Sequence, residues 1–91
     1  MNIFKRAKSW LNRPKYKSDK KLNLHLKQLN GMIELLFKDG KCFLITNGTN
    51  YHEKEYTLDK LNRPLFIQGL GELKNWTENS VYLGSLKMEI V

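Results

Sequence analysis

Cysteine is nearly absent from this chain of 91 residues, which contains only Cys42. A single cysteine cannot form an internal disulfide, and it cannot build a zinc site made of several cysteines. No long apolar run follows the positively charged N-terminus, so we expect neither a secretory signal nor a membrane-spanning segment. Together these absences predict a protein that works in the reducing cytoplasm.

Motifs for catalysis, metal binding and phosphate binding are also lacking. Cys42 lies in an apolar run, which is typical of a buried thiol rather than of a nucleophile paired with His25 or His52. The two histidines also lack the spacing of metal ligands. Gly69 and Gly71 follow a strand-like run, but the third glycine and the Lys-Ser/Thr pair of phosphate-binding loops are missing. We therefore expect no enzyme, no cofactor and no metal ion.

Positive charge is concentrated at one end of the chain. Residues 1–21 carry eight basic side chains and one acidic side chain, Asp19, and so account for the whole formal net charge of +7. Residues 22–91 hold eight basic and eight acidic side chains and are neutral. The sequence thus divides into a basic amphipathic arm with its linker, residues 1–21, and a small β-rich domain, residues 22–91. A basic arm attracts polyanions such as nucleic acid, an anionic membrane or an acidic protein surface.

The arm is predicted to contain a short amphipathic helix over residues 2–13, which Pro14 ends. Its apolar side chains share one arc of about 120°, and they are Ile3, Phe4, Ala7, Trp10 and Leu11. Aromatic side chains lie among the basic ones, a composition that suits stacking on bases beside phosphate contacts. The candidate residues for binding nucleic acid or another anion are Lys5, Arg6, Lys8, Arg13, Lys15, Lys17, Lys20, Lys21, Trp10 and Tyr16.

Two interpretations fit residues 22–36. Leucines spaced by three and four residues favour a helix, whereas Asn-Gly at residues 30–31 and Asp-Gly at residues 39–40 favour hairpin turns. Folding the chain about these turns places Leu24 opposite Phe37 and gives an apolar face that continues across three strands. We therefore prefer a strand for residues 22–29 and keep a helix that ends at Gly31 as the alternative, and a hairpin over residues 32–46 is expected in either case.

The remaining sequence is expected to complete the sheet. A fourth strand over residues 51–57 needs a bulge or a shifted register, because a simple loop would place Glu53 and Glu55 on the core face. The other expected elements are one helical turn and two strands, over residues 57–63, 65–67 and 81–91. The predicted fold is α+β and mostly β, with a short N-terminal amphipathic helix followed by a bent antiparallel β-meander or small open barrel of about five strands.

The predicted function is that of a non-enzymatic small basic protein that contacts nucleic acid through its arm, with the sheet as a platform. Lysine outnumbers arginine 13 to 3, which indicates an AT-rich coding sequence of the kind found in phages and mobile elements. The alternative is therefore a small protein of that type that binds or inhibits a host protein. Its basic arm would then contact an acidic surface of the host protein. Peripheral association with an anionic membrane and formation of a homodimer are further alternatives.

Overall fold

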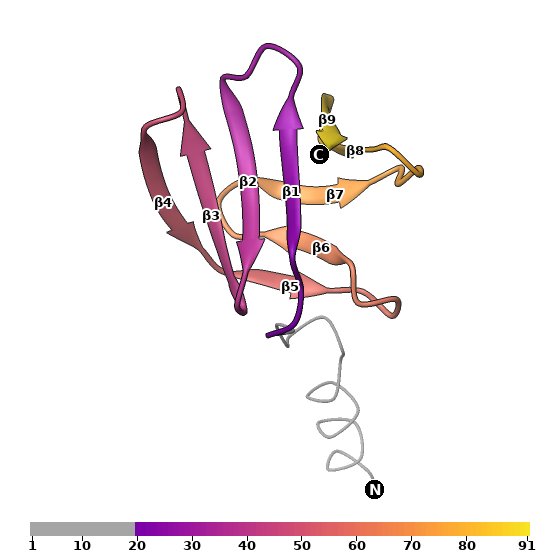
Figure 1. Cartoon of the computed structure of the whole chain (residues 1–91). Coiled ribbons are helices and arrows are strands. Elements are labelled where there is room, and N and C mark those ends of the chain that lie inside the picture. Colours follow the sequence, from indigo (N-terminus) through magenta and orange to yellow (C-terminus); the bar gives the residue numbers. More distant parts are fainter. Residues whose placement is uncertain (1–19) are drawn as a thin grey trace, which may run out of the picture.

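The computed structural model describes residues 20–91, which form nine β-strands and no helix. The strands are β1 (Leu24–Gln28), β2 (Ile33–Lys38), β3 (Lys41–Thr46), β4 (Asn50–Lys54), β5 (Tyr56–Leu58), β6 (Pro64–Ile67), β7 (Gly71–Lys74), β8 (Ser80–Leu83) and β9 (Leu86–Ile90). They form one antiparallel sheet in the order β4-β3-β2-β1-β9-β8-β7-β6-β5. Two meanders, β1–β4 and β5–β9, therefore join where β9 pairs with β1 (Figure 1).

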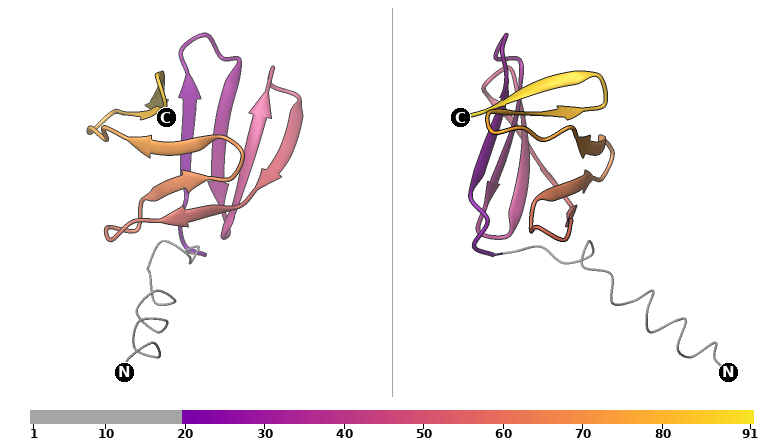
Figure 2. Two further views of the ribbon diagram at one scale, coloured as in Figure 1. Left: turned by 180° about the vertical axis from the view of Figure 1, so that it is seen from behind. Right: turned by 90° about the vertical axis from the view of Figure 1, so that its right-hand side faces the viewer.

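The sheet rolls up so that its two meanders face each other (Figure 2). Strands β5, β6 and β7 cross behind β1–β4 at a steep angle (Figure 1). The two edges of the sheet, β4 and β5, follow one another in the chain and are separated only by Glu55. The roll is therefore nearly a closed barrel.

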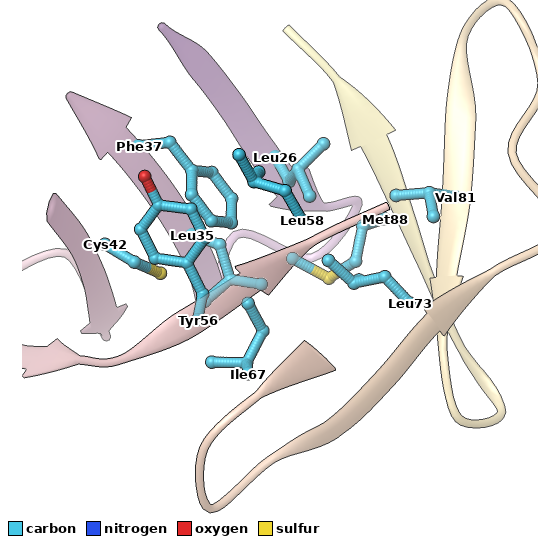
Figure 3. Close-up of a cluster of buried hydrophobic side chains, with 10 residues drawn as sticks. All are labelled: Leu26, Leu35, Phe37, Cys42, Tyr56, Leu58, Ile67, Leu73, Val81 and Met88. Atoms are coloured by element: carbon cyan, nitrogen blue, oxygen red, sulfur yellow. The ribbon is translucent and has the colours of Figure 1, made fainter. Parts of the chain in front are cut away.

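The core lies between the two meanders, as Figure 3 shows. Its buried side chains are Leu26, Leu35, Phe37, Cys42, Tyr56, Leu58, Ile67, Leu73, Val81 and Met88. The ring of Phe37 from β2 meets the ring of Tyr56 from β5 edge to face, with centroids 5.1 Å apart and planes at 79°. Every strand except β4 supplies at least one of these side chains, so both meanders depend on the same core.

The register predicted for the first meander is confirmed. Leu24 pairs with Phe37 across β1 and β2. Asp39 and Gly40 both have positive φ, 54° and 80°, as the favoured two-residue hairpin turn requires. The alternative helix is wrong, because the leucine-rich segment forms β1 and β2.

The prediction of an α+β fold with about five strands was wrong, since residues 20–91 form nine strands and no helix. The helix predicted over residues 2–13 lies outside the described residues. The helical turn expected over residues 57–63 is not formed, because the chain continues in β5 and then turns at Asn62, whose φ is 60°. Strands β5 to β8 have only three or four residues each, too few to show the alternation that predicts a strand.

The shifted register expected for the fourth strand is observed. β4 pairs with β3 so that His52 lies opposite Leu44 and Glu53 opposite Phe43. Glu53 therefore lies on the outer face of the sheet, away from the core. Tyr56 enters the core instead, as the first residue of β5.

Candidate nucleic-acid interface

Two of the ten residues predicted to bind nucleic acid, Lys20 and Lys21, lie in the described part of the chain. Both are exposed and precede β1, at the root of the basic arm. The other eight lie outside the described residues, and they are Lys5, Arg6, Lys8, Arg13, Lys15, Lys17, Trp10 and Tyr16. The root of the arm is therefore the part of the predicted interface whose surroundings the structure shows.

Lys20 lies against the turn between β2 and β3. A Cβ atom placed on Gly40 would lie 3.5 Å from the Cα atom of Lys20 and 3.4 Å from its Cγ atom. Gly40 also has a φ of 80°, a backbone conformation that favours glycine, and its contact with Lys20 is of ordinary van der Waals length. The turn thus fixes where the arm meets the domain.

The same turn carries two further lysines. Lys38 and Lys41 pair directly across β2 and β3, and both are exposed. Like charges directly opposite each other on a sheet are unfavourable, so stability alone does not favour this pair. Only Asp39, within the turn, offers a nearby opposite charge in the sequence. We call the four lysines at this end of the sheet the root cluster: Lys20, Lys21, Lys38 and Lys41.

Sequence reasoning missed Lys38 and Lys41, although a signal for them was present. They flank the Asp-Gly turn at residues 39–40, and the predicted hairpin already placed them opposite each other. The charge sum over residues 22–91 concealed them, because acidic side chains elsewhere in the domain balance the total. The structure shows where the charged side chains lie, whereas the net charge of a segment does not.

The outer face of the first meander carries an apolar cluster of its own. Ile45 is only 4 % exposed, yet it lies outside the core cluster. Leu36 and Phe43 are half-buried and pair across β2 and β3, while Tyr51 is exposed and pairs with Ile45. We call these four side chains the outer patch: Leu36, Phe43, Ile45 and Tyr51. Apolar side chains gathered on one sheet face are typical of a contact surface.

His25 and Glu34 border the outer patch and are engaged with each other. The Nε2 atom of His25 lies 2.7 Å from the Oε1 atom of Glu34. Cys42 lies on the opposite face of the sheet, within the core, and burial raises the pKa of its thiol to about 12. His25 and Cys42 therefore do not form a nucleophile–base pair, and the thiol stays protonated at neutral pH.

The second histidine, His52, is exposed on the edge strand β4. Among residues 20–91, no three side chains of His, Cys, Asp or Glu come together in a way that could hold a metal ion. No helix of this same part of the chain is long and apolar enough to cross a membrane.

Comparison with family models, curated proteins and solved structures finds no match to this chain. The root cluster and the outer patch are therefore the two surface features from which its function is inferred.

Proposed function

We propose that this protein is a non-enzymatic nucleic-acid-binding protein whose basic arm and root cluster contact the phosphate backbone together. The observation that carries the proposal is the position of Lys38 and Lys41, paired across two strands beside the root of the arm at Lys20. The positive charge of the arm thus continues onto a fixed part of the sheet. A fixed lysine pair gives a polyanion a defined place to contact the domain, whereas the arm alone supplies charge without position.

Electrostatics supports this combination. Residues 1–21 carry a net charge of +7, and Lys38 and Lys41 add two positive charges on either side of Asp39 and Gly40, where Lys20 contacts the turn. Lysines that neutralise phosphates release condensed counterions, so binding of this kind weakens steeply as salt is added. Trp10 and Tyr16 of the arm offer aromatic rings on which unpaired bases stack, which favours single-stranded nucleic acid as one ligand.

The test is fluorescence anisotropy with single- and double-stranded oligonucleotides over a series of salt concentrations. The double variant Lys38→Glu/Lys41→Glu should bind more weakly and show a shallower salt dependence, by about 0.9 in log–log slope for each phosphate of a duplex that the variant no longer neutralises. The matched control is Lys60→Glu/Lys74→Glu, which makes the same change in total charge at exposed lysines of the second meander. Equal weakening by both double variants would contradict the role of the root cluster, and absence of binding at low salt would remove the proposal.

The alternative partners give different results in parallel experiments. A host protein with an acidic surface should form a complex that survives nuclease treatment, and an anionic membrane should sediment the protein with vesicles. A homodimer should be visible by analytical ultracentrifugation without any ligand. A cytoplasmic site of action belongs to the proposal, because the sole cysteine is a buried free thiol.

A further inference from the structure

We propose that the helix predicted over residues 2–13 docks on the outer patch of its own chain. The outer patch consists of Leu36, Phe43, Ile45 and Tyr51, and the docking side of the helix is its apolar arc. This contact is intramolecular and involves no nucleic acid, so it goes beyond the proposed function.

The residue pattern of strand β3 indicates that another segment packs on the outer face of the sheet. Its inward residues Cys42 and Leu44 belong to or pack against the core, and its outward residues Phe43 and Ile45 are apolar as well. A sheet face that meets water normally alternates apolar and polar side chains, whereas strands covered on both faces are apolar throughout. β3 has the pattern of a covered strand, yet none of the other described strands lies over its outer face (Figure 2).

The arm begins at the edge of this face and is long enough to reach it. Lys20 lies against Gly40, three residues before Phe43 along the chain. That separation is about 10 Å at the rise of a β-strand. The linker from Pro14 to Lys20 spans up to about 20 Å when extended, so the end of the predicted helix can lie over the patch.

The chemistry of the two surfaces is complementary. A helix of this length does not persist alone in water, so its apolar arc needs a surface to cover it. Glu34 pairs with Ile45 across the strands and Glu53 pairs with Phe43, so acidic side chains border the outer patch on this side, while Lys38 and Lys41 border it at the turn where the arm begins. Basic side chains border the apolar arc of the predicted helix. This division of charge favours an orientation in which the basic side chains of the helix lie near Glu34 and Glu53 and away from Lys38 and Lys41.

A second copy of the chain is a weaker candidate for the cover. A stable dimer buries about 800 Å² on each partner, which is more than four side chains of one sheet face supply. The arm is tethered beside the patch, and tethering gives it a high effective concentration that a separate molecule lacks. A small contact is therefore sufficient for the arm and insufficient for a dimer.

The experiment uses the full chain with Trp76→Phe, which leaves Trp10 as its only tryptophan. Without nucleic acid, Trp10 should emit at shorter wavelength than in denaturant, and acrylamide should quench it severalfold less. Phe43→Ser in this background should shift the emission to longer wavelength and restore quenching. The matched control Leu61→Ser removes an apolar side chain that is 70 % exposed, outside the outer patch, and should leave both readings unchanged.

Circular dichroism and a thermal melt show whether the Phe43 variant stays folded. If it does not, Tyr51→Ser takes its place, because Tyr51 is 61 % exposed on an edge strand and its loss spares the core. Emission of Trp10 at the wavelength of a water-exposed indole in the folded parent would overturn the proposal. The proposal would also be overturned if Trp10 were protected from acrylamide and neither outer-patch variant reduced that protection. Shielding that disappears on dilution would assign the contact to a second copy and overturn docking within one chain.

Discussion

The turns of the two meanders differ in how many hydrogen bonds their side chains make. Strands β1–β4 have five or six residues each, and their turns depend on backbone conformation. The residues with positive φ in these turns are Gly31, Asp39, Gly40, Asn47 and Gly48. Strands β5–β9 are shorter, with three to five residues. This meander also contains five residues with positive φ, and they are Asn62, Gly69, Gly71, Asn75 and Gly84. In two of its loops, however, one side chain accepts several hydrogen bonds, whereas Asn30 in the first meander accepts one, from the N–H group of Met32.

Asp59 organises the first of these loops. Its Oδ1 atom accepts hydrogen bonds from the backbone N–H groups of Leu61 and Arg63, at 2.8 and 2.9 Å. Its Oδ2 atom accepts another from the Nε–H group of Arg63 at 2.9 Å. The guanidinium of Arg63 in turn lies over the ring of Trp76, 5.6 Å from its centroid, and so connects two loops of the second meander.

Thr77 organises the second loop in a similar way. Its Oγ1 atom accepts hydrogen bonds from the backbone N–H groups of Asn79 and Ser80, at 3.3 and 3.0 Å. The difference between the meanders is therefore one of degree: both use residues with positive φ, and the second adds more side-chain hydrogen bonds. Both kinds of turn are local in the sequence, because Asp59 and Thr77 bond backbone groups two to four residues further on. The contact of Arg63 with Trp76, by contrast, joins partners that only the folded chain brings together.

The largest predicted effect tests whether the two meanders fold as one unit. Phe37→Ala should reduce the free energy of unfolding by about 3–5 kcal/mol, because it removes a fully buried ring that packs on Tyr56 of the other meander. A domain of this size has about that much stability in total. Amide exchange should therefore show both meanders losing protection together.

The control for this variant is Leu29→Ala, at a side chain that is 81 % exposed, and its effect should stay within about 0.5 kcal/mol. If amides of β6 and β7 kept their protection while those of β2 and β3 lost it, the meanders would be independent units and the shared core would not couple them.

The first meander shows what could be predicted from the sequence. Its alternating apolar residues and its Asp-Gly turn fixed the pairing of Leu24 with Phe37, which the structure confirms. The positive charge of the arm could be predicted from the sequence as well. The predicted hairpin was also sufficient to place Lys38 and Lys41 opposite each other. The outward apolar residues of β3 could not be assigned a role, because the sequence does not show which strand faces are left uncovered.

The second meander shows why the rest could not be predicted. Residues 51–57 look like one strand, but the chain turns a corner at Glu55 and its two parts form opposite edges of the sheet. Pro64 directly follows the helical turn expected over residues 57–63, yet it opens β6, where the first position of a strand tolerates proline. Both features follow from the closure of the sheet, which is a property of all nine strands and has no local signal.

A smaller effect is predicted for the turns of the first meander. Gly40 and Gly48 have similar φ values, 80° and 73°, so valine at either position should cost about 1–3 kcal/mol through backbone strain. Gly40→Val should cost more, because the two methyl groups of valine would extend beyond a Cβ position that already contacts Lys20, whereas no atom lies within 4 Å of the Cβ position at Gly48. Urea denaturation of the two variants measures the difference. Equal losses would show that Lys20 is not held against the turn in solution.

The smallest effect concerns the side-chain-fixed loop of the second meander and depends on pH. Burial acts to raise the pKa of Asp59, but hydrogen bonds from the backbone and side chain of Arg63 and from the backbone of Leu61 outweigh it, so its pKa is lowered overall. A carboxyl group whose pKa is lower in the folded than in the unfolded chain stabilises the fold at pH values above its unfolded pKa of about 3.9. This stabilisation is lost as the pH falls from there through the folded pKa.

Asp59→Ala should therefore lower the free energy of unfolding at pH 7 by about 1–2 kcal/mol, because it removes an acceptor used by three N–H groups. The difference in the free energy of unfolding between the variant and the parent should shrink as the pH is lowered toward 3. Protonation of Asp59 in the parent weakens the hydrogen bonds that its carboxylate accepts. The control is Glu72→Ala, which removes an exposed carboxylate on β7 and should change stability by less than about 0.5 kcal/mol. Denaturation curves at pH 7, 5 and 3 supply the comparison. A difference that stayed constant over this range would mean that Asp59 acts through the shape of its loop and not through its charge, and the second meander would then resemble the first.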